Sequence, residues 1–451
     1  MAKFYALFLS LIFFNVIISL VNQYVLRGDE MKIELNNIGP FVEASVDIDG
    51  ITVVAGENGT GKSTIGKTLY AMFNAFYLYK KHIKNKRIDN LELLIDNYVL
   101  SSFSNSYEND DEEEKTQQFL EHIVEHLNEY LNDESKLKND LRDYYKAGDT
   151  DEEKDMIDEI TNDIVESLNL SDDIILESIV DEAFEGEFHY EISNKLSKDA
   201  SAAELFIKDK SIRVNFSDDA VSEIPEHFEL TKKIVYIDDP YVLDDLNDYA
   251  RFIPLMIAIH ENHRNALLSK LQRGNQDSIE KIKIKNKLSS IFEKLDGINV
   301  GELFLDKTVF KYNDPSMDVD FDVRNIAAGL KSFVILKTLL ENGSIEQNGI
   351  IIFDEPETHL HPKWQLVLAE LIVLIQKEFN MHVLINTHSP YFIRAIEVYS
   401  SKHETDMTTK YYLAKHENGI SGIEDVTDST EKIYGLLAEP LDRLSEDLED
   451  E

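Results

Sequence analysis

The sequence predicts an α/β fold with a helical, acidic insertion. Short β-branched runs of the kind buried in a sheet occur near both ends of the chain, and segments with helical spacing follow them. The middle differs, because residues 101–230 hold 38 Asp and Glu against 11 Lys and Arg, which favours solvated helices. A chain of 451 residues with 43% hydrophobic residues can bury a large core, so global disorder is excluded.

The composition also excludes several kinds of site. The chain has no cysteine, which rules out disulfides, thiolate catalysis and cysteine-ligated zinc, and fits a reducing cytosol. The net charge of −41 opposes loose binding to the phosphate backbone of DNA. Because residues 101–230 carry 27 of these excess negative charges, the rest of the surface is expected to repel nucleic acid less strongly.

The first thirty residues allow two interpretations. Residues 4–21 are almost wholly apolar, which is typical of a short membrane anchor or a signal sequence. No small-residue cleavage site follows them, and Met31 opens a natural first strand. We therefore expect translation to begin at Met31, with an inner-membrane anchor at residues 4–21 as the alternative.

The expected elements follow in chain order. Strands are predicted at Lys32–Leu35, Val42–Val46 and Ile51–Ala55, and a helix at Ser63–Phe76. Helices are expected through residues 77–200, then a hairpin at Leu205–Ile207 and Ser211–Phe216, a buried strand at Ile234–Ile237, helices over residues 250–296, and strands at Gly301–Leu305, Val309–Tyr312 and Val319–Val323.

The predicted domain organisation follows from these elements. The divisions are residues 1–30, an apolar leader; 31–100, a first lobe; 101–230, the acidic insertion; 231–300, a strand with a helical arm; 301–430, a second lobe; and 431–451, an acidic tail. In the arm, Arg264–Lys294 holds eight basic and three acidic residues, so it is the candidate for contact with DNA, with a solvated helix face as the alternative.

A complete P-loop pattern follows the third predicted strand and opens the helix. It reads Gly56-Glu57-Asn58-Gly59-Thr60-Gly61-Lys62-Ser63-Thr64. Its glycines let backbone N–H groups converge on phosphates, and the start of the helix adds partial positive charge. Lys62 is expected to reach the β- and γ-phosphates of ATP, and the Ser63 hydroxyl to bind Mg²⁺.

Two later strands end in residues that suit the same chemistry. The run Ile350–Phe353 leads to Asp354 and Glu355, and adjacent carboxylates at a sheet edge are costly unless a cation or a reacting water uses them. Asp354 is the expected Mg²⁺ ligand and Glu355 the general base. The run Val383–Thr387 leads to His388, which we expect to contact the γ-phosphate and the attacking water.

Together these motifs resemble ABC-type ATPases of the SMC, RecF and OLD-like group, and especially stand-alone bacterial defence ATPases of the Septu type. The resemblance covers residues 31–76 and 322–397 and implies a P-loop NTPase fold of the ABC ATPase head type. It also implies that Gly329 acts in trans, in a signature motif that contacts the γ-phosphate bound by the opposite subunit of an ATP sandwich. Ala327 stands where the family has serine, which implies slow hydrolysis.

Other family positions match less well. No Q-loop glutamine is identifiable, and Asp238 or Asp239 is the candidate replacement. His359 and His361 have a spacing compatible with metal binding, but the resemblance favours a subunit-contact loop.

The leading hypothesis is a cytoplasmic, dimeric ATP-gated switch in anti-phage defence or DNA repair that controls a separate nuclease or effector. The ATP sandwich makes it a homodimer or a higher homo-oligomer. An ABC transporter subunit and a non-catalytic nucleotide-binding scaffold are the alternatives.

Overall fold

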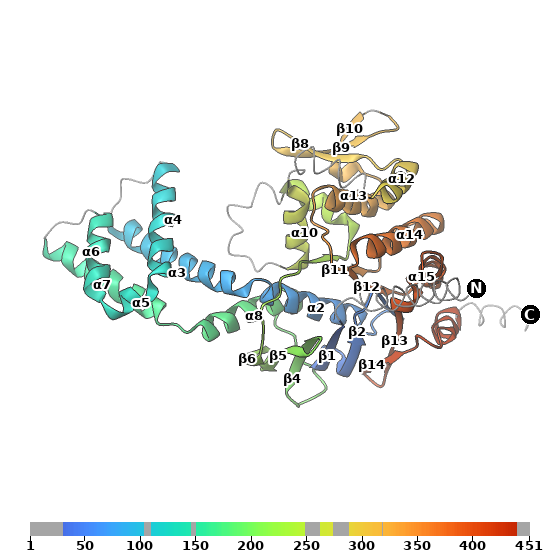
Figure 1. Ribbon diagram of the computed structural model, residues 1–451, viewed down its shortest axis with the longest axis horizontal. Coiled ribbons are helices and arrows are strands. Elements are labelled where there is room, and N and C mark those ends of the chain that lie inside the picture. Colours follow the sequence, from blue (N-terminus) through green and yellow to red (C-terminus); the bar gives the residue numbers. More distant parts are fainter. Residues whose placement is uncertain are drawn as a thin grey trace, which may run out of the picture. The chain divides into compact units, whose positions relative to one another are not determined.

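The computed structural model describes residues 30–102, 110–145, 150–248, 262–273, 288–317 and 319–439. The chain forms two compact units (Figure 1). The sheet unit comprises the chain up to Tyr77 together with the chain from Asp181 onward, and the helical unit comprises Leu78–Val180. The domain boundaries drawn from the sequence stay predictions beside this division.

The sheet unit is built on a mixed sheet of eleven strands. Their order is β6-β5-β4-β1-β2-β14-β13-β3-β12-β11-β7. Their bounds are β1 Met31–Ile38, β2 Phe41–Asp47, β3 Ile51–Gly56, β4 Ser201–Ile207, β5 Lys210–Ser217, β6 Ala220–Glu226, β7 Ile234–Ile237, β11 Ile350–Asp354, β12 His382–Thr387, β13 Thr409–Glu417 and β14 Ile420–Asp425. The α/β class, the three opening strands and the later hairpin are thereby confirmed.

Five neighbouring strands, β13, β3, β12, β11 and β7, run parallel. Strands β3, β7, β11 and β12 are buried along their whole length, as expected for parallel strands covered on both faces. In their register, Asp354 lies opposite Asn386, and Thr387 lies opposite Ala55. The loops that follow β3, β11 and β12 therefore leave the sheet at one edge.

Helices cover both faces of this parallel region. Gly66 on α2 (Lys62–Phe76) lies against Ile352, whereas the next residue along the strand, Ile351, joins the core with Phe333 on α13 (Ala328–Glu341). Consecutive strand residues point to opposite faces, so α2 and α13 lie on opposite faces. Other described helices of this unit include α10 His263–Gln272, α12 Ser289–Gly297, α14 Pro362–Phe379, α15 Pro390–Lys402, η1 Pro240–Asp245, η2 Val323–Asn325 and η3 Asp406–Thr408.

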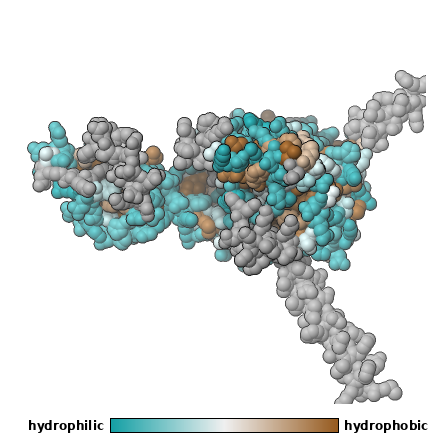
Figure 2. All heavy atoms as spheres, turned by 90° about the horizontal axis from the view of Figure 1, so that it is seen from above, coloured by the Kyte–Doolittle hydropathy of each residue, from teal (hydrophilic) through white to brown (hydrophobic). Residues whose placement is uncertain are grey.

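A second sheet has three antiparallel strands, β8 Glu302–Asp306, β9 Val309–Asp314 and β10 Val319–Asp322, as the sequence predicted. Figure 2 views the molecule from the side on which these strands lie in Figure 1. The described surface on that side is mostly hydrophilic, with hydrophobic side chains gathered in small groups.

The helical unit has its own core. Its helices are α3 Tyr79–Ser102, α4 Asp110–Glu125, α5 Leu127–Asn132, α6 Glu134–Tyr145 and α7 Asp151–Leu168, and α8 Asp172–Phe188 continues into the sheet unit. Apolar residues such as Leu91, Ile123, Leu141 and Ile160 pack together, while most of the acidic side chains described in this unit are exposed. A capping box of Thr150 and Glu153 begins α7.

Several sequence predictions concern other parts of the chain. The apolar segment 4–21, most of the acidic tail and the lysine-rich centre of Arg264–Lys294 lie outside the described residues. Within the described ranges, every helix is too short or too polar to cross a membrane.

Candidate functional site

The P-loop forms a tight turn between β3 and α2 that requires glycine. Gly59 and Gly61 have φ angles of 79° and 88°, a left-handed conformation that favours glycine. A Cβ atom on Gly61 would lie 2.6 Å from Pro40 Cγ, and one on Gly56 would lie 2.4 Å from the carbonyl oxygen of Ala414. Asn58 is exposed at the tip of the turn, where its backbone can meet a ligand.

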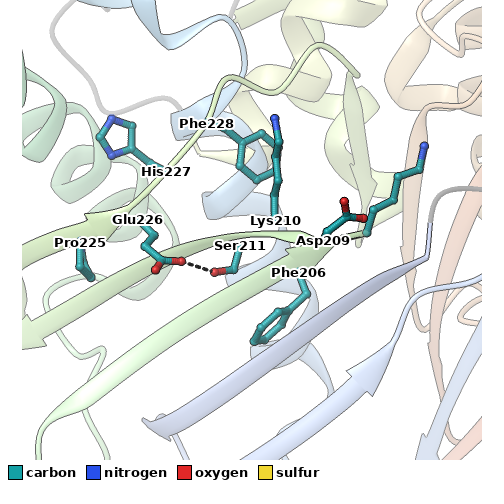
Figure 3. A pocket seen from close by; sticks show the side chains of 9 residues that line it. Phe206, Asp209, Lys210, Ser211, Pro225, Glu226, His227 and Phe228 are labelled. Carbon is teal, nitrogen blue, oxygen red and sulfur yellow. Dashed lines mark hydrogen bonds between the residues drawn. The ribbon is translucent and has the colours of Figure 1, made fainter.

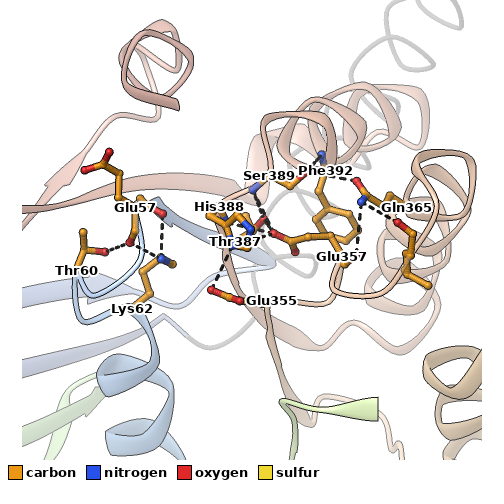
Figure 4. Close-up of polar contacts among 12 residues, drawn as sticks. Glu57, Thr60, Lys62, Glu355, Glu357, Gln365, Thr387, His388, Ser389 and Phe392 are labelled. Carbon is orange, nitrogen blue, oxygen red and sulfur yellow. Dashed lines mark hydrogen bonds and ion pairs between the residues drawn. The ribbon is translucent and has the colours of Figure 1, made fainter. Parts of the chain in front are cut away.

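Lys62, the first residue of α2, is folded back onto the P-loop (Figure 4). Its Nζ donates hydrogen bonds to the carbonyl oxygens of Gly56 (2.9 Å) and Glu57 (2.7 Å). Burial lowers the pKa of Lys62, although the charges of Glu355, Asp354, Glu357 and Glu57 oppose this effect. The lysine therefore shares one site with the acids that follow β11.

Ser63 and Thr64 continue the first turn of α2. Ser63 is exposed, so its hydroxyl is open to a ligand. Thr64 is half-buried and lies against Gly39, where an added Cβ would come within 2.9 Å of the threonine methyl group. Both positions fit the P-loop prediction, with Ser63 the one free to reach a metal ion.

Asp354 ends β11 with one oxygen bound and the other unpaired. The Tyr236 hydroxyl donates a hydrogen bond of 2.7 Å to Oδ2. Burial, followed by the charge of Asp354, raises the pKa of Tyr236 well above its usual value, so this hydroxyl remains a donor. Oδ1 is buried and has no hydrogen-bond partner among the described residues.

This donor set fits a magnesium ion. Mg²⁺ prefers oxygen ligands and is held in P-loop proteins by few protein groups together with phosphate oxygens. A buried carboxylate oxygen without a partner is costly unless a cation uses it. Asp354 Oδ1 and the exposed Ser63 hydroxyl, at the edge where β11 and α2 meet the P-loop, supply this chemistry.

Glu355 and His388 face each other across the loops that follow β11 and β12. Glu355 has a φ of 50°, and its backbone N–H donates to the carbonyl oxygen of Asn386 (2.8 Å), which fixes its unusual backbone. Nδ1 of His388 lies 3.2 Å from Oε1 of Glu355. Both side chains are partly exposed, so a water molecule or a phosphate can reach them.

Glu357 organises the histidine loop, a role that the sequence analysis missed. Its buried Oε1 accepts hydrogen bonds from the Thr387 hydroxyl (2.5 Å) and from the backbone N–H groups of His388 (3.2 Å) and Ser389 (3.1 Å) (Figure 4). Burial raises the pKa of Glu357, and the hydrogen bond from Thr387 opposes this rise. The available signal was an acid two residues after Glu355, in a segment interpreted only as a subunit contact.

Gly329, the predicted signature residue, lies near the start of α13, beside α14 and the loop that follows β11. A Cβ added there would lie 2.9 Å from Trp364 Cζ3 and 3.4 Å from the carbonyl oxygen of His359. Ala327, the N-cap residue, provides no side-chain hydrogen bond to the helix. Lys331 is buried and forms an ion pair with Asp244, and its Nζ atom lies 4.5 Å from the centroid of the Tyr241 ring. Its charge is therefore balanced by partners within the chain.

The candidate Q-loop acids also have internal partners. Asp238 Oδ2 lies 3.1 Å from Nε2 of His263, and Asp239 accepts a hydrogen bond from the backbone N–H of Tyr241 as it caps η1. His361 caps α14 through Lys363 N–H, and no group of three or more His, Asp or Glu in the described part of the chain is arranged to hold a metal ion.

A separate hollow of about 680 Å³ lies along β4–β6 (Figure 3). Its lining includes Phe206, Lys210, Glu226 and Phe228, with a hydrogen bond of 2.9 Å from Ser211 to Glu226. It contains none of the motif residues, so it is not part of the candidate site.

Known proteins resemble this chain in sequence and, more weakly, in overall structure. A probable ATPase of retron Vc95 from Vibrio cholerae is 23% identical over 195 residues, which cover 40% of this chain and 34% of the relative. A probable ATPase of retron Ec83 from Escherichia coli is 26% identical over 172 residues, covering 32% and 30%. The matched region is thus about a third of each relative's length.

Among solved structures, an SMC head bound to the C-winged helix domain of ScpA has 12% sequence identity and a TM-score of 0.43, covering 90% of this chain and 99% of that one.

The family of the chain is defined by sequence. The pattern of the AAA ATPase domain matches residues 31–393, a range that includes the P-loop, the acids after β11 and His388. This confirms the ATPase group expected from the motifs: the chain belongs to the AAA ATPase domain family.

Proposed function

We propose that this protein binds ATP with Mg²⁺ at the loops after β3, β11 and β12, and hydrolyses it in a dimer that switches a separate effector. The observation that carries the proposal is the gathering of Lys62, Asp354, Glu355 and His388 at one edge of the parallel sheet. These residue types match the parts that phosphoryl transfer to water requires.

Each residue has a role in the proposed reaction. The P-loop N–H groups hold the phosphates, and Lys62 exchanges the carbonyl oxygens of Gly56 and Glu57 for phosphate oxygens. Ser63 and Asp354 hold Mg²⁺, which neutralises charge that develops on the phosphates.

The attack on the γ-phosphorus uses the remaining pair. Glu355 orients a water molecule and accepts its proton as the water oxygen bonds to phosphorus and the bond to the ADP oxygen breaks. His388, 3.2 Å from Glu355, is suited to contact the same water and the γ-phosphate.

A second subunit is part of the proposal, because the resemblance to ABC-type ATPases implies that Gly329, near the start of α13, acts in trans. The first N–H groups of α13 have no side-chain cap, so they are suited to receive a phosphate bound by a partner subunit. Without a serine hydroxyl at Ala327, we expect fewer contacts to the γ-phosphate and slow turnover.

The names of the two relatives support a role beside a defence system more than a role in transport. Both are named as probable ATPases of retrons. We therefore propose a cytoplasmic switch that controls a nuclease or another effector in DNA-related defence. A transporter subunit and a scaffold that binds ATP without hydrolysis are the alternatives that the experiments must exclude.

The test measures nucleotide binding, phosphate release and mass. We expect the wild-type protein to hydrolyse Mg-ATP and Lys62→Ala to lose nucleotide binding. We expect Glu355→Gln to bind ATP but to hydrolyse it at least about 100-fold more slowly than the wild type. Glu355→Gln should also accumulate as an ATP-bound dimer in light scattering. Glu293→Gln, an exposed acid on α12, is the matched control. Unchanged turnover in Glu355→Gln would remove that residue from the base role.

A further inference from the structure

A buried ion cluster lies beside β7, outside the motifs of the candidate site. It consists of Glu187 at the end of α8, His263 at the start of α10, and Asp238 after β7. The Glu187 side chain is fully buried, and its two oxygens accept hydrogen bonds from the backbone N–H (2.7 Å) and the Nδ1 atom (2.6 Å) of His263. Asp238 Oδ2 lies 3.1 Å from the other ring nitrogen, an ion-pair contact.

The histidine in this cluster is an imidazolium at neutral pH. Burial alone would lower the pKa of His263, but its contacts with Asp238 and Glu187 outweigh it and raise the pKa to about 9. Burial of Asp238 is likewise outweighed by its contact with His263, and the pKa of Asp238 is lowered.

The imidazolium packs on a tyrosine that reaches the candidate site. The rings of His263 and Tyr236 stack with centroids 4.3 Å apart and an interplanar angle of 23°. The Tyr70 ring lies edge-on to both, with centroids 6.1 Å from Tyr236 and 5.9 Å from His263. A cation over an aromatic face is attracted by the ring, so the cluster holds Tyr236 by charge as well as by packing.

The hydroxyl of this tyrosine decides which oxygen of Asp354 is free. It donates to Oδ2 at 2.7 Å, which leaves Oδ1 buried and without a partner in the described chain. Gly66 on α2 leaves room for this arrangement, because a Cβ there would lie 3.1 Å from the Tyr236 hydroxyl. Glycine within a helix costs about 1 kcal/mol relative to alanine. At this position the cost is offset by the room that glycine leaves for the Tyr236 hydroxyl.

We propose that Tyr236 is a positioning residue that orients Asp354 for magnesium, and that the Glu187–His263–Asp238 cluster holds its ring in place. This inference rests on the proposed ATP-binding function. It adds to that function residues that reach Asp354 through Tyr236. Partners of this kind around a metal ligand change metal affinity by about 10- to 100-fold when they are removed.

The experiment measures metal binding and nucleotide binding separately. Purified wild type and Tyr236→Phe are titrated with a fluorescent ATP analogue in EDTA and again over a range of Mg²⁺ concentrations, and Mn²⁺ binding to the ATP-bound protein is followed by electron paramagnetic resonance. We expect Tyr236→Phe to keep its affinity for the analogue in EDTA and to bind the metal about 10-fold more weakly. Tyr312→Phe is the matched control, since the Tyr312 hydroxyl is also buried and accepts from Gly301 N–H (2.9 Å).

A second variant tests the cluster without leaving the fully buried Glu187 charge unpaired, while the Asp238 carboxylate that remains is partly exposed. Glu187→Gln combined with His263→Gln removes both charges, and we expect a smaller loss of metal affinity in the same direction. Metal affinity equal to wild type in Tyr236→Phe would overturn the inference and leave the proposed function standing. Failure of the wild type to bind any ATP analogue would instead refute the proposed function, and this inference with it.

Discussion

Glu357 is a buried carboxylate whose value lies in the three donors that it satisfies. Without it, the Thr387 hydroxyl and the N–H group of His388 would lose their acceptor, and the N–H group of Ser389 would keep only the Thr387 hydroxyl oxygen. A buried donor left unpaired costs about 1–3 kcal/mol, so the loop that carries His388 depends on this one side chain.

We expect Glu357→Ala to lower the free energy of unfolding by about 3 kcal/mol, because several donors lose one acceptor. We also expect its turnover to fall about 100-fold, because a shift of about 1 Å in catalytic groups has that effect. Urea unfolding and phosphate release measure the two effects. Glu397→Ala, which removes a carboxylate bound to Arg394 and Tyr434, is the control that should keep its turnover. Full activity in Glu357→Ala would refute the role.

His263 predicts a pH dependence of stability. Its pKa is about 9 in the folded chain and 6.5 in its ordinary state, so the folded chain binds the proton more tightly. The groups that face the ring are Glu187, Asp238, Tyr236 and Tyr70. The stabilisation is complete below pH 6.5 and is lost as the pH rises through 9, amounting to about 3 kcal/mol.

Urea unfolding from pH 6 to pH 9.5 tests whether the free energy of unfolding falls as the pH rises. The wild type should lose stability over the window, and the variant with Glu187→Gln and His263→Gln should lose less. Equal slopes in the two proteins would contradict it.

Sequence alone predicted the residues that belong to short motifs. Lys62, Asp354, Glu355 and His388 each stand next to a buried strand, and the geometry brings them together as expected. His263 could not be found in this way. Its partners come from α8 and β7, which are distant in sequence, and nothing in the residues around it marks the contact.

Among the elements, the turn between β3 and α2 depends on its glycines to different degrees. Gly61 combines a φ of 88° with Pro40 and Phe41 atoms 2.6 and 2.7 Å from an added Cβ. Gly59 has a φ of 79° but no atom within 4 Å of an added Cβ.

We therefore expect Gly61→Ala to destabilise the nucleotide-free protein by about 3 kcal/mol, from backbone strain and overpacking together. Gly59→Ala should cost about 1 kcal/mol, because only the backbone is strained. Urea unfolding without ATP measures both, and equal losses would show that crowding by Pro40 and Phe41 has no part.

Individual strands were predicted better than the pairing between strands. Periodicity identified β1 and the hairpin of β4 and β5, but not that β4 pairs with β1 and extends the same sheet. The two strands are separated by the whole helical unit, and alternation within a strand says which side chains share a face, not which strand lies beside it.

For the whole molecule, the net charge of −41 predicts that salt stabilises the fold. Like charges repel in the compact state, and ions screen charges that are more than about 10 Å apart at 0.1 M salt. We expect the thermal midpoint to rise between 0.02 and 0.5 M NaCl, equally with KCl, in calorimetry. A midpoint that rises only with sulfate would indicate ion exclusion from the surface instead.

Lys62 has hydrogen-bond acceptors within the turn that precedes it. Two carbonyl oxygens of the turn accept hydrogen bonds from its ammonium group. Release of a nucleotide would therefore leave no buried cation without a partner. Arrival and departure of a triphosphate then become swaps of one set of oxygens for another. Under the proposed function, such an exchange would let the protein release and rebind ATP without unfolding this turn.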